Sequence, residues 1–230
     1  MCGRYSMIAT KEQIQTQLPF VEDVSVSLHE SYNIAPTQSA LVVTNEQPFG
    51  LQYLKWGLIP SWSNDGKNQG KLINARAEGI FTKPSFRVPI RQKRCIVLAD
   101  SFYEWRRSGT RKLPYRIRPK NGSLLIMGGI WEIWDKYGEP KRSFSIITTP
   151  PNAEMAALHN RAPVVFTDAL ECQLWLDNNS LEDINSLLQP VKDDYFDIYR
   201  VSEMVNSVHN NSPHLHEEVP EELDLFSNVG

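Results

Sequence analysis

The stretch PYRIRPKNGSLLIMGGIWEIW, residues 114–134, contains two apolar, strand-like runs on either side of the dipeptide Asn121-Gly122. Asn-Gly between such runs is a strong signal for a β-hairpin, because both residues accept the backbone angles of a tight turn. The preceding segment RCIVLADSFYEW, residues 94–105, reads as one long strand that begins apolar and ends polar. The centre of the chain therefore predicts antiparallel strands.

Further strands and short helices continue this pattern toward both ends of the chain. Strands are expected at residues 40–44, 49–56, 144–149 and 195–202. Short helices are expected at residues 10–18, 152–158, 168–176 and 180–188, with Thr10, Asn152 and Ser180 as N-caps. Because strands dominate, we predict an α+β single domain with a curled, mostly antiparallel, barrel-like β-sheet and short peripheral helices.

Composition indicates an intracellular enzyme-sized domain. The 230 residues, 41% of them hydrophobic, are enough to build a sizeable core. The sequence has no apolar run of the roughly 18 residues that span a bilayer, and its start, MCGRYSMIAT, does not resemble a signal peptide. The three cysteines, at positions 2, 95 and 172, form neither a disulfide framework nor a metal-type pair. We expect a cytoplasmic protein without membrane contact, metal or cofactor.

The charges are unevenly distributed. The chain has 24 Lys and Arg against 27 Asp and Glu, but residues 217–230 hold five acids and no base. We therefore divide the chain into a domain at 1–216 and an acidic tail at 217–230. Five cations gather in residues 83–94, namely Lys83, Arg87, Arg91, Lys93 and Arg94. They form either a local phosphate-binding face or an ordinary solvated surface.

The first residues, Met-Cys-Gly-Arg, suggest a reactive N-terminus. Aminopeptidases remove Met1 when the second side chain is small, which would expose Cys2 with a free α-amine beside its thiol. The amine titrates near pH 7.7–8.0 and the thiol near 8.5, so both are usable nucleophiles. Such an aminothiol converts an aldehyde first to a Schiff base and then to a five-membered thiazolidine. The alternative is that Cys2 is an ordinary cysteine.

Four segments carry polar residues where a core segment would not tolerate them. They are LINARAE, LADSFYEW, MAALHNRAPVVF and VSEMVNSVHNNSP, with Asn74, Arg76, Asp100, Glu104, His159, Arg161, Asn206, His209, Asn210 and Asn211. Sites are commonly built at the ends of secondary-structure elements, as these are. Each residue also has a simpler interpretation: Glu104 as a surface residue, His159 as a core histidine, Asn74 as a turn former.

Seven ordered motifs together resemble the SOS response-associated peptidase (SRAP) family, whose members act as abasic-site sensors. They are MCGRY at 1–5, YNIAP at 32–36, WGLIPSW at 56–62, INARAE at 73–78, LADSFYEW at 98–105, LHNRAPVV at 158–165 and VNSVHNNSP at 205–213. The resemblance covers nearly the whole chain.

The resemblance implies a role for each matching residue. Cys2 would form a thiazolidine crosslink with the ring-opened abasic aldehyde, Asn74 would hold Cys2, and Glu104 and His159 would be catalytic. The implied DNA contacts are Arg4, Asn33, Trp62, Arg76, Trp105, Thr148, Arg161 and His209. Ser63 departs from the pattern of some bacterial members, which carry a second tryptophan there, so one stacking contact is in question.

We therefore expect a monomeric protein that crosslinks to abasic sites in single-stranded DNA and shields them. It would work near the nucleoid or replication fork and have a weak AP-lyase side activity. A glutamic acid can supply the proton that expels water during Schiff-base formation. Two alternatives remain. The protein could be a thiol peptidase using Cys2, His159 and Asn74, or a DNA-binding module without chemistry.

Overall fold

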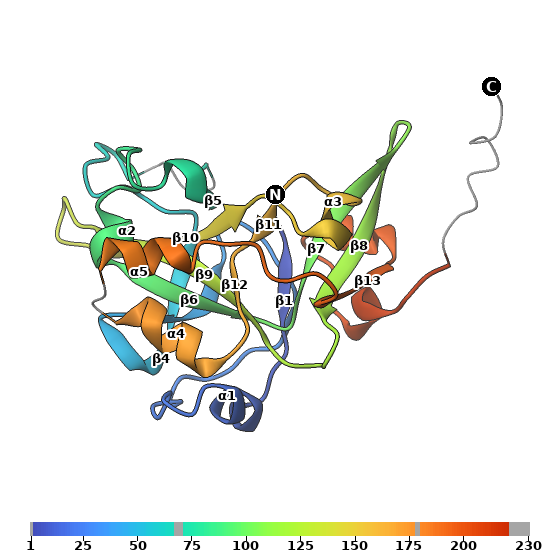
Figure 1. Ribbon diagram of the computed structural model, residues 1–230, viewed down its shortest axis with the longest axis horizontal. Coiled ribbons are helices and arrows are strands. Elements are labelled where there is room, and N and C mark those ends of the chain that lie inside the picture. Colours follow the sequence, from blue (N-terminus) through green and yellow to red (C-terminus); the bar gives the residue numbers. More distant parts are fainter. Residues whose placement is uncertain (1, 67–70, 178–179, 221–230) are drawn as a thin grey trace.

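The structure, a computed structural model, describes residues 2–66, 71–177 and 180–220. Strands form the body of the molecule and short helices lie around it (Figure 1), so the predicted α+β class is confirmed. Within the described ranges, no helix is both long and apolar enough to cross a membrane.

Among the described residues, five strands close into a barrel. They are β3 (Ser39–Thr44), β4 (Gln47–Trp56), β6 (Arg94–Ala99), β9 (Leu125–Trp134) and β10 (Lys141–Thr149). Hydrogen-bonded neighbours follow the order β10-β4-β3-β6-β9, and β9 pairs again with β10, which closes the ring. Only the β4–β10 pair in this ring is parallel. The predicted curled, mostly antiparallel, barrel-like sheet is therefore confirmed.

Three short strands extend the barrel: β5 (Asn74–Arg76), β11 (Ala162–Pro163) and β12 (Val165–Phe166). β10 changes neighbour along its length, from β4 opposite Phe144 to β5 opposite Ile146. β11 joins the far end of β10, opposite Thr148 and Thr149. The end of β10 thus gathers two segments that are distant in sequence, those of the INARAE and LHNRAPVV motifs.

A second sheet has the strand order β13-β8-β7-β1-β2. Its strands are β1 (Tyr5–Met7), β2 (Ser31–Ile34), β7 (Ser101–Ser108), β8 (Arg111–Pro119) and β13 (Phe196–Arg200). β1 lies between β7 and β2, with Tyr5 opposite both Phe102 and Ile34. The first residues of the chain are therefore interior to a sheet rather than at its edge.

The helices are short, as predicted, and their caps are local. They are α1 (Lys11–Gln17), α2 (Pro89–Gln92), α3 (Ala153–Ala156), α4 (Ala169–Leu176), α5 (Leu181–Ser186), and the 3-10 helices η1 (Ala77–Gly79), η2 (Glu203–Asn206) and η3 (Pro213–His216). The predicted N-caps Thr10, Asn152 and Ser180 all accept a hydrogen bond from the first turn of their helix.

The single strand predicted over 94–105 is wrong, because the chain leaves the barrel at Asp100. β6 ends one residue before it and β7 begins one residue after it, in the other sheet. The Asp100 amide donates to the carbonyl oxygen of Ser6 at 3.0 Å, and its carboxylate pairs with Arg116. A carboxylate this far inside needs such partners, so the strand bends where they are available.

The hairpin predicted around Asn121-Gly122 is also wrong. The turn forms, with Gly122 at a φ of 71° and its amide 3.2 Å from the carbonyl oxygen of Pro119. However, β8 pairs with β7 and β13, whereas β9 pairs with β6, β10 and β12. The turn therefore carries the chain from one sheet to the other. Turn chemistry fixes the local backbone angles but not the partner of each strand.

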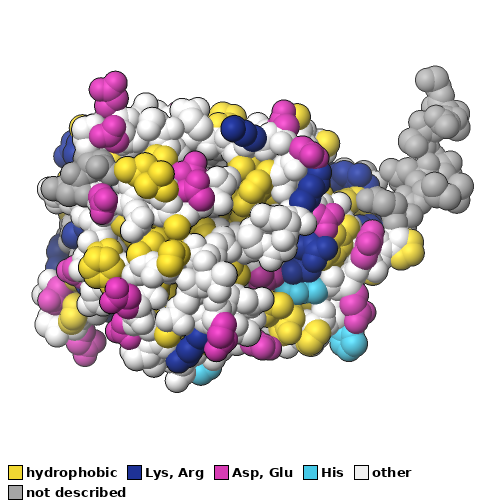
Figure 2. All heavy atoms as spheres, turned by 60° about the horizontal axis from the view of Figure 1, so that its bottom comes forward, with side chains coloured by type: hydrophobic (Ala, Val, Ile, Leu, Met, Phe, Trp, Pro, Cys, Tyr) yellow, Lys and Arg dark blue, Asp and Glu magenta, His cyan; other side chains and the backbone are white. Residues whose placement is uncertain are grey.

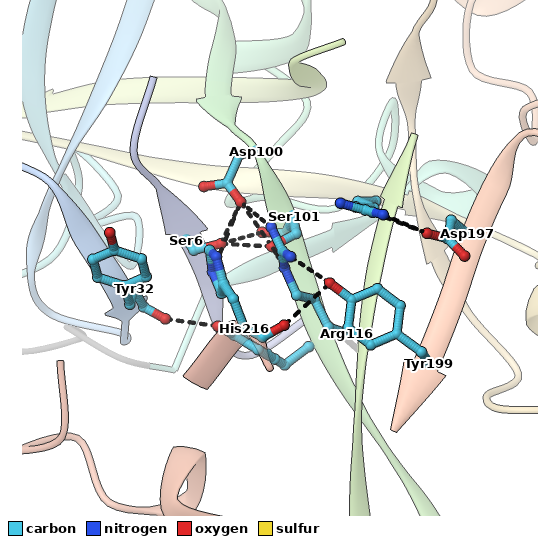
Figure 3. A network of polar contacts seen from close by, with 10 residues as sticks. Ser6, Tyr32, Asp100, Ser101, Arg116, Asp197, Tyr199 and His216 are labelled. Atoms are coloured by element: carbon cyan, nitrogen blue, oxygen red, sulfur yellow. Dashed lines mark hydrogen bonds and ion pairs between the residues drawn. The ribbon is translucent and has the colours of Figure 1, made fainter. Parts of the chain in front are cut away.

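Asp100 is the centre of a polar cluster that holds β1 in place (Figure 3). Its Oδ2 accepts hydrogen bonds from Ser6 on β1 at 2.9 Å, Ser101 on β7 at 3.0 Å and Arg116 on β8 at 2.8 Å. Arg116 also donates from Nε to the Ser101 hydroxyl at 2.7 Å. Breaking a buried ion pair by removing one partner is strongly destabilising, so this cluster fixes the three strands relative to each other.

The same cluster reaches the C-terminal part of the described chain. Arg116 binds the hydroxyl of Tyr199 on β13, and that hydroxyl donates to the carbonyl oxygen of His216 at 3.3 Å. The His216 ring lies edge-on to Tyr32, with centroids 4.8 Å apart, and its Nε2 is 3.8 Å from Asp100 Oδ2. η3 is thereby fastened against β1 and β2.

The described structure continues past the predicted domain boundary at residue 216. Glu218 forms a β-bridge with Val201, and Arg200 donates to the carbonyl oxygen of Pro220 at 2.8 Å. Most of the predicted acidic tail, residues 221–230, lies outside the described residues. On the face in Figure 2, which brings the side of α1 forward, acidic and basic side chains are intermingled.

His216 should make the stability of the fold depend on pH. Burial, followed by the charge of Arg116, lowers the pKa of His216 to about 4, although Asp100 acts in the opposite direction. In the unfolded chain this ring titrates near 6.5, so between those values the unfolded state binds a proton that the folded state does not. This contribution to the free energy of unfolding is therefore present above about pH 6.5 and is lost as pH falls toward about 4.

We expect wild type to lose about 1–2 kcal/mol more than His216→Gln between about pH 7 and pH 4.5, measured by urea denaturation. His214→Gln is the matched control, because His214 is an exposed ring on the same helix. Parallel losses in wild type and His216→Gln would contradict the assignment.

Candidate active site

Cys2 lies three residues before the start of β1 and is only 1% exposed. The Tyr103 amide donates to the carbonyl oxygen of Arg4 at 2.9 Å, which continues the β1–β7 pairing toward Cys2. From the barrel side, Asn74 on β5 donates from Nδ2 to the carbonyl oxygen of Cys2 at 2.8 Å. The structure thus brings the two residues together and fixes the backbone of Cys2 between both sheets.

The Cys2 thiol is kept protonated by its surroundings. Burial is the larger cause and the negative charge of Glu104 the second; together they raise the pKa of the thiol well above its ordinary value. The positive charge of the chain N-terminus and, less strongly, a hydrogen bond from the Arg4 backbone lower the pKa of the thiol but do not offset these two causes. Because only the thiolate is a strong nucleophile, a base must remove the Cys2 proton before the sulfur can attack.

A cleft of about 430 Å³ opens where the two sheets meet the C-terminal segments. Its lining residues are Arg4, Glu104, Trp105, Arg107, Lys112, His159 and Asn206. Four of them are residues that the sequence analysis selected, and they come from three separate motifs. Glu104 is 3% exposed, so its carboxylate is largely shielded from water although it borders the cleft.

His159 enters the cleft from the segment that follows α3. Its Nδ1 accepts a hydrogen bond from the backbone amide of Arg161 at 3.0 Å. In the neutral ring, this contact assigns the proton to Nε2. This hydrogen bond fixes the orientation of the histidine ring, which lines the cleft.

Arg161 is held by an acidic partner and by the backbone. Its guanidinium forms a two-pronged ion pair with Glu78, with one contact at 2.9 Å, and donates to the carbonyl oxygen of Thr148. The hydrogen bond from Arg161 lowers the pKa of Glu78. Thr148 is fully buried, so its contact is with Arg161. Arg76 lies opposite Thr148 in the β5–β10 pairing and is exposed.

Arg4 is connected to Asn33, another predicted DNA contact. Its guanidinium donates to Asn33 Oδ1 at 2.7 Å and lies 5.9 Å from the centre of the Trp105 ring. Asn33 is 2% exposed and donates to the carbonyl oxygens of Ser207 at 2.9 Å and Asn210 at 2.8 Å. These hydrogen bonds hold the turn that follows η2 in place.

Of the eight predicted DNA contacts, Arg4 and Trp105 line the cleft, whereas six are not among its lining residues: Asn33, Trp62, Arg76, Thr148, Arg161 and His209. His209 is exposed on the turn that Asn33 secures. Trp62 is 56% exposed on the loop after β4, where Lys136 donates to its carbonyl oxygen at 3.3 Å. The neighbouring Ser63, which departs from the family pattern, is 3% exposed, so the position offers no stacking surface in this chain.

The basic segment 83–94 is only partly a surface. Arg94 is 1% exposed and binds four backbone carbonyl groups, including that of Trp175 at 2.7 Å. Lys93 pairs with the buried Glu132. Two of the five cations therefore have structural partners, which weakens the prediction of a phosphate-binding face there.

Three residues of the cleft were given no role by the sequence analysis. Asn206 stood in a recognised motif, and its Oδ1 accepts a hydrogen bond from Trp105 Nε1 at 2.7 Å. Arg107 and Lys112 flank the turn at Gly109. In the sequence, the one indication of a role for these two cations was the basic run RRSGTRK, and such a run is equally typical of a solvent-exposed hairpin. In the described part of the chain, no group of His, Cys, Asp and Glu could hold a metal ion.

Comparisons with known proteins agree with the motifs. The family model described as SOS response associated peptidase (SRAP) matches residues 1–208. The chain is 43% identical over 221 residues to the abasic site processing protein YoqW of Bacillus subtilis, covering 94% of this chain and 98% of that protein. It is 32% identical to the abasic site processing protein HMCES of Gallus gallus, covering 80% and 64%.

The fold has also been seen in crystals. A protein from Bacteroides thetaiotaomicron superposes with a TM-score of 0.83 at 32% identity, covering 95% of this chain and all of that one.

Glu104→Gln should make Cys2 more reactive toward a small alkylating reagent. The substitution removes the negative charge that helps to raise the pKa of the Cys2 thiol, although burial still acts. We expect the pH profile of iodoacetamide labelling, followed by mass spectrometry of the peptide containing Cys2, to shift to lower pH. Labelling of the buried Cys95 is the internal control. An unchanged Cys2 profile would show that the carboxylate does not act on the sulfur.

Proposed function

Because this chain belongs to the SOS response-associated peptidase family, we propose that it processes abasic sites in single-stranded DNA through a covalent link to Cys2. The observation that carries the proposal is that Asn74 holds the buried Cys2, and that the charge of Glu104, which lines the cleft together with His159, acts on the Cys2 thiol. The relative YoqW is an abasic site processing protein, and we extend that activity to this chain on the basis of this geometry.

The reaction begins once Met1 is removed. The α-amine of Cys2 adds to the aldehyde of the ring-opened sugar and gives a carbinolamine. Glu104, as an acid, protonates the carbinolamine hydroxyl, which leaves as water and creates the Schiff base. His159, through Nε2, moves a proton at the sugar hydroxyl during ring opening.

The sulfur then closes the ring. Glu104, now a carboxylate, accepts and keeps the thiol proton as sulfur bonds to the former aldehyde carbon, while the C=N electron pair moves to the protonated Schiff-base nitrogen and leaves it a neutral secondary amine. The product is a thiazolidine, and the net change is the loss of one water. Burial, the largest cause of the raised pKa of the Cys2 thiol, supports this order, because it keeps the sulfur protonated until the imine is in place. β-Elimination from the same Schiff base would be a minor AP-lyase route.

Charged and aromatic residues around the cleft would hold the strand without reading its sequence. Arg76 and Arg161 would contact phosphates on the β5 side, and Trp105, Trp62 and His209 would contact neighbouring nucleotides. The buried residues Asn33 and Thr148 would act through Arg4 and Arg161, to which they are hydrogen-bonded. We propose that the protein works as a monomer on exposed single strands, such as those at replication forks.

The thiol-peptidase alternative fits the site less well. A peptidase of that type needs a thiolate formed beside a histidine. The pKa of the Cys2 thiol is raised here, chiefly by burial and secondly by the carboxylate of Glu104, and both oppose formation of a thiolate.

Intact mass spectrometry tests the covalent step. Wild-type protein should lack Met1 and, with an abasic single-stranded oligonucleotide, form a denaturant-stable adduct one water lighter than the sum of its parts. Cys2→Ser keeps the amine but not the sulfur, so its adduct should require borohydride trapping. An intact strand without a lesion is the control. A denaturant-stable adduct of Cys2→Ser without reductant would exclude ring closure through sulfur.

Glu104→Gln should slow crosslinking by about 10²–10⁴-fold, because it removes the acid while preserving shape. Binding of the same oligonucleotide, measured by fluorescence anisotropy, should change little. Glu203→Gln is the matched control, because Glu203 is an exposed carboxylate paired with Arg111. A Glu104→Gln rate within about twofold of wild type would remove this residue from the mechanism.

A further inference from the structure

The hairpin of β7 and β8 presents two unneutralised cations to the cleft. Arg107 and Lys112 lie directly opposite each other in the antiparallel pairing, two residues beyond Trp105 and therefore on the same face as that ring. Both side chains are exposed, and both line the cleft that contains Glu104 and His159.

This cross-strand pair is unfavourable by itself. Like charges directly opposite each other on one face of a sheet repel, and they destabilise the hairpin unless an anion lies between them. The other cations of the hairpin are accommodated: Arg111 pairs with Glu203 at 2.6 Å, and Arg106 lies 4.8 Å from the centre of the Tyr115 ring. Among the described residues, neither Arg107 nor Lys112 has an acidic partner.

We propose that Arg107 and Lys112 form a phosphate site, which takes one phosphodiester of the single strand next to the lesion. The inference rests on the proposed function of the cleft and adds a binding element to it. The planar guanidinium of Arg107 suits two oxygens of one phosphate, and the Lys112 ammonium supplies a second, adjustable charge. A phosphate between them would convert their repulsion into two attractive contacts.

The site would act on one flank of the lesion only. β5, with Arg76, lies on one side of β1, and the β7–β8 hairpin lies on the other (Figure 1). A strand whose abasic sugar is at Cys2 would therefore run from β5 toward the hairpin. Phosphates on one side would meet Arg76 and Arg161, and a phosphate on the other side would meet Arg107 and Lys112.

The test uses oligonucleotides with a tetrahydrofuran abasic analogue, which lacks the aldehyde and cannot crosslink. Three probes place the analogue in the interior, at the 5′ end or at the 3′ end of the strand, so that each terminal probe lacks one flank. Binding of wild type, Arg107→Ala/Lys112→Ala and the control Arg111→Ala is measured by fluorescence anisotropy at several salt concentrations.

On the interior probe, the double variant should bind more weakly and lose about 0.7 from the slope of log affinity against log salt, because one phosphate contact is removed. The double variant should show the same loss of affinity and of salt slope on one terminal probe and no loss on the other. The control Arg111→Ala should bind all three probes like wild type. Unchanged slopes, or equal losses on both terminal probes, would overturn the proposal. The analogue cannot react, so this experiment measures binding alone. If the proposed crosslinking chemistry were wrong, the binding result would still stand, and the two failures can therefore be told apart.

Discussion

The constraint on which the rest of the structure depends is the burial of the first residues inside a sheet. β1 lies between β7 and β2, and the Asp100 cluster fastens it through Ser6. An edge strand could fray at the N-terminus, whereas a strand paired on both sides holds the residue before it at a defined depth. Cys2 is consequently 1% exposed although it is the second residue of the chain.

Burial also determines the order in which two nucleophiles on one residue can act. A buried thiol beside the Glu104 carboxylate keeps its proton, because both features oppose a second negative charge. A neutral α-amine can attack without first losing a proton, so neither burial nor the Glu104 carboxylate prevents its reaction. The proposed reaction therefore begins at nitrogen, and sulfur follows only when an electrophilic imine lies within reach. A premature thiolate would be open to oxidation and to unrelated electrophiles.

Sequence reasoning succeeded where the determining interactions are local. Thr10, Asn152 and Ser180 cap their helices through contacts within the first turn, so three residues of sequence suffice to predict them. It failed where pairing is decided at a distance: Asn121-Gly122 forms its turn, but nothing nearby indicates that the flanking strands belong to different sheets. The bend at Asp100 likewise depends on Arg116, 16 positions further along the chain.

The candidate site shows the same division between local and distant information. Taken singly, each polar residue could also have an ordinary structural role. Only the ordered motifs indicated that Cys2, Asn74, Glu104 and His159 belong to one site. Arg107 and Lys112 were missed because a charged hairpin is ordinarily a solvated one. Their significance comes from the strand register, which places them opposite each other, and from the cleft, which neither charge counting nor spacing can reveal.

Under the proposed function, the pairing of Arg161 with Glu78 would favour retention of a lesion over retention of intact DNA. Glu78 holds the guanidinium in position but is itself 53% exposed at its side chain, so a phosphate can replace it without burying an unpaired carboxylate. The contact of Arg161 with the Thr148 carbonyl group need not change in that exchange. Because an existing ion pair must be given up, the net gain from each such phosphate contact is small. Undamaged strands would then be released readily, and only a sugar that reacts with Cys2 would be retained.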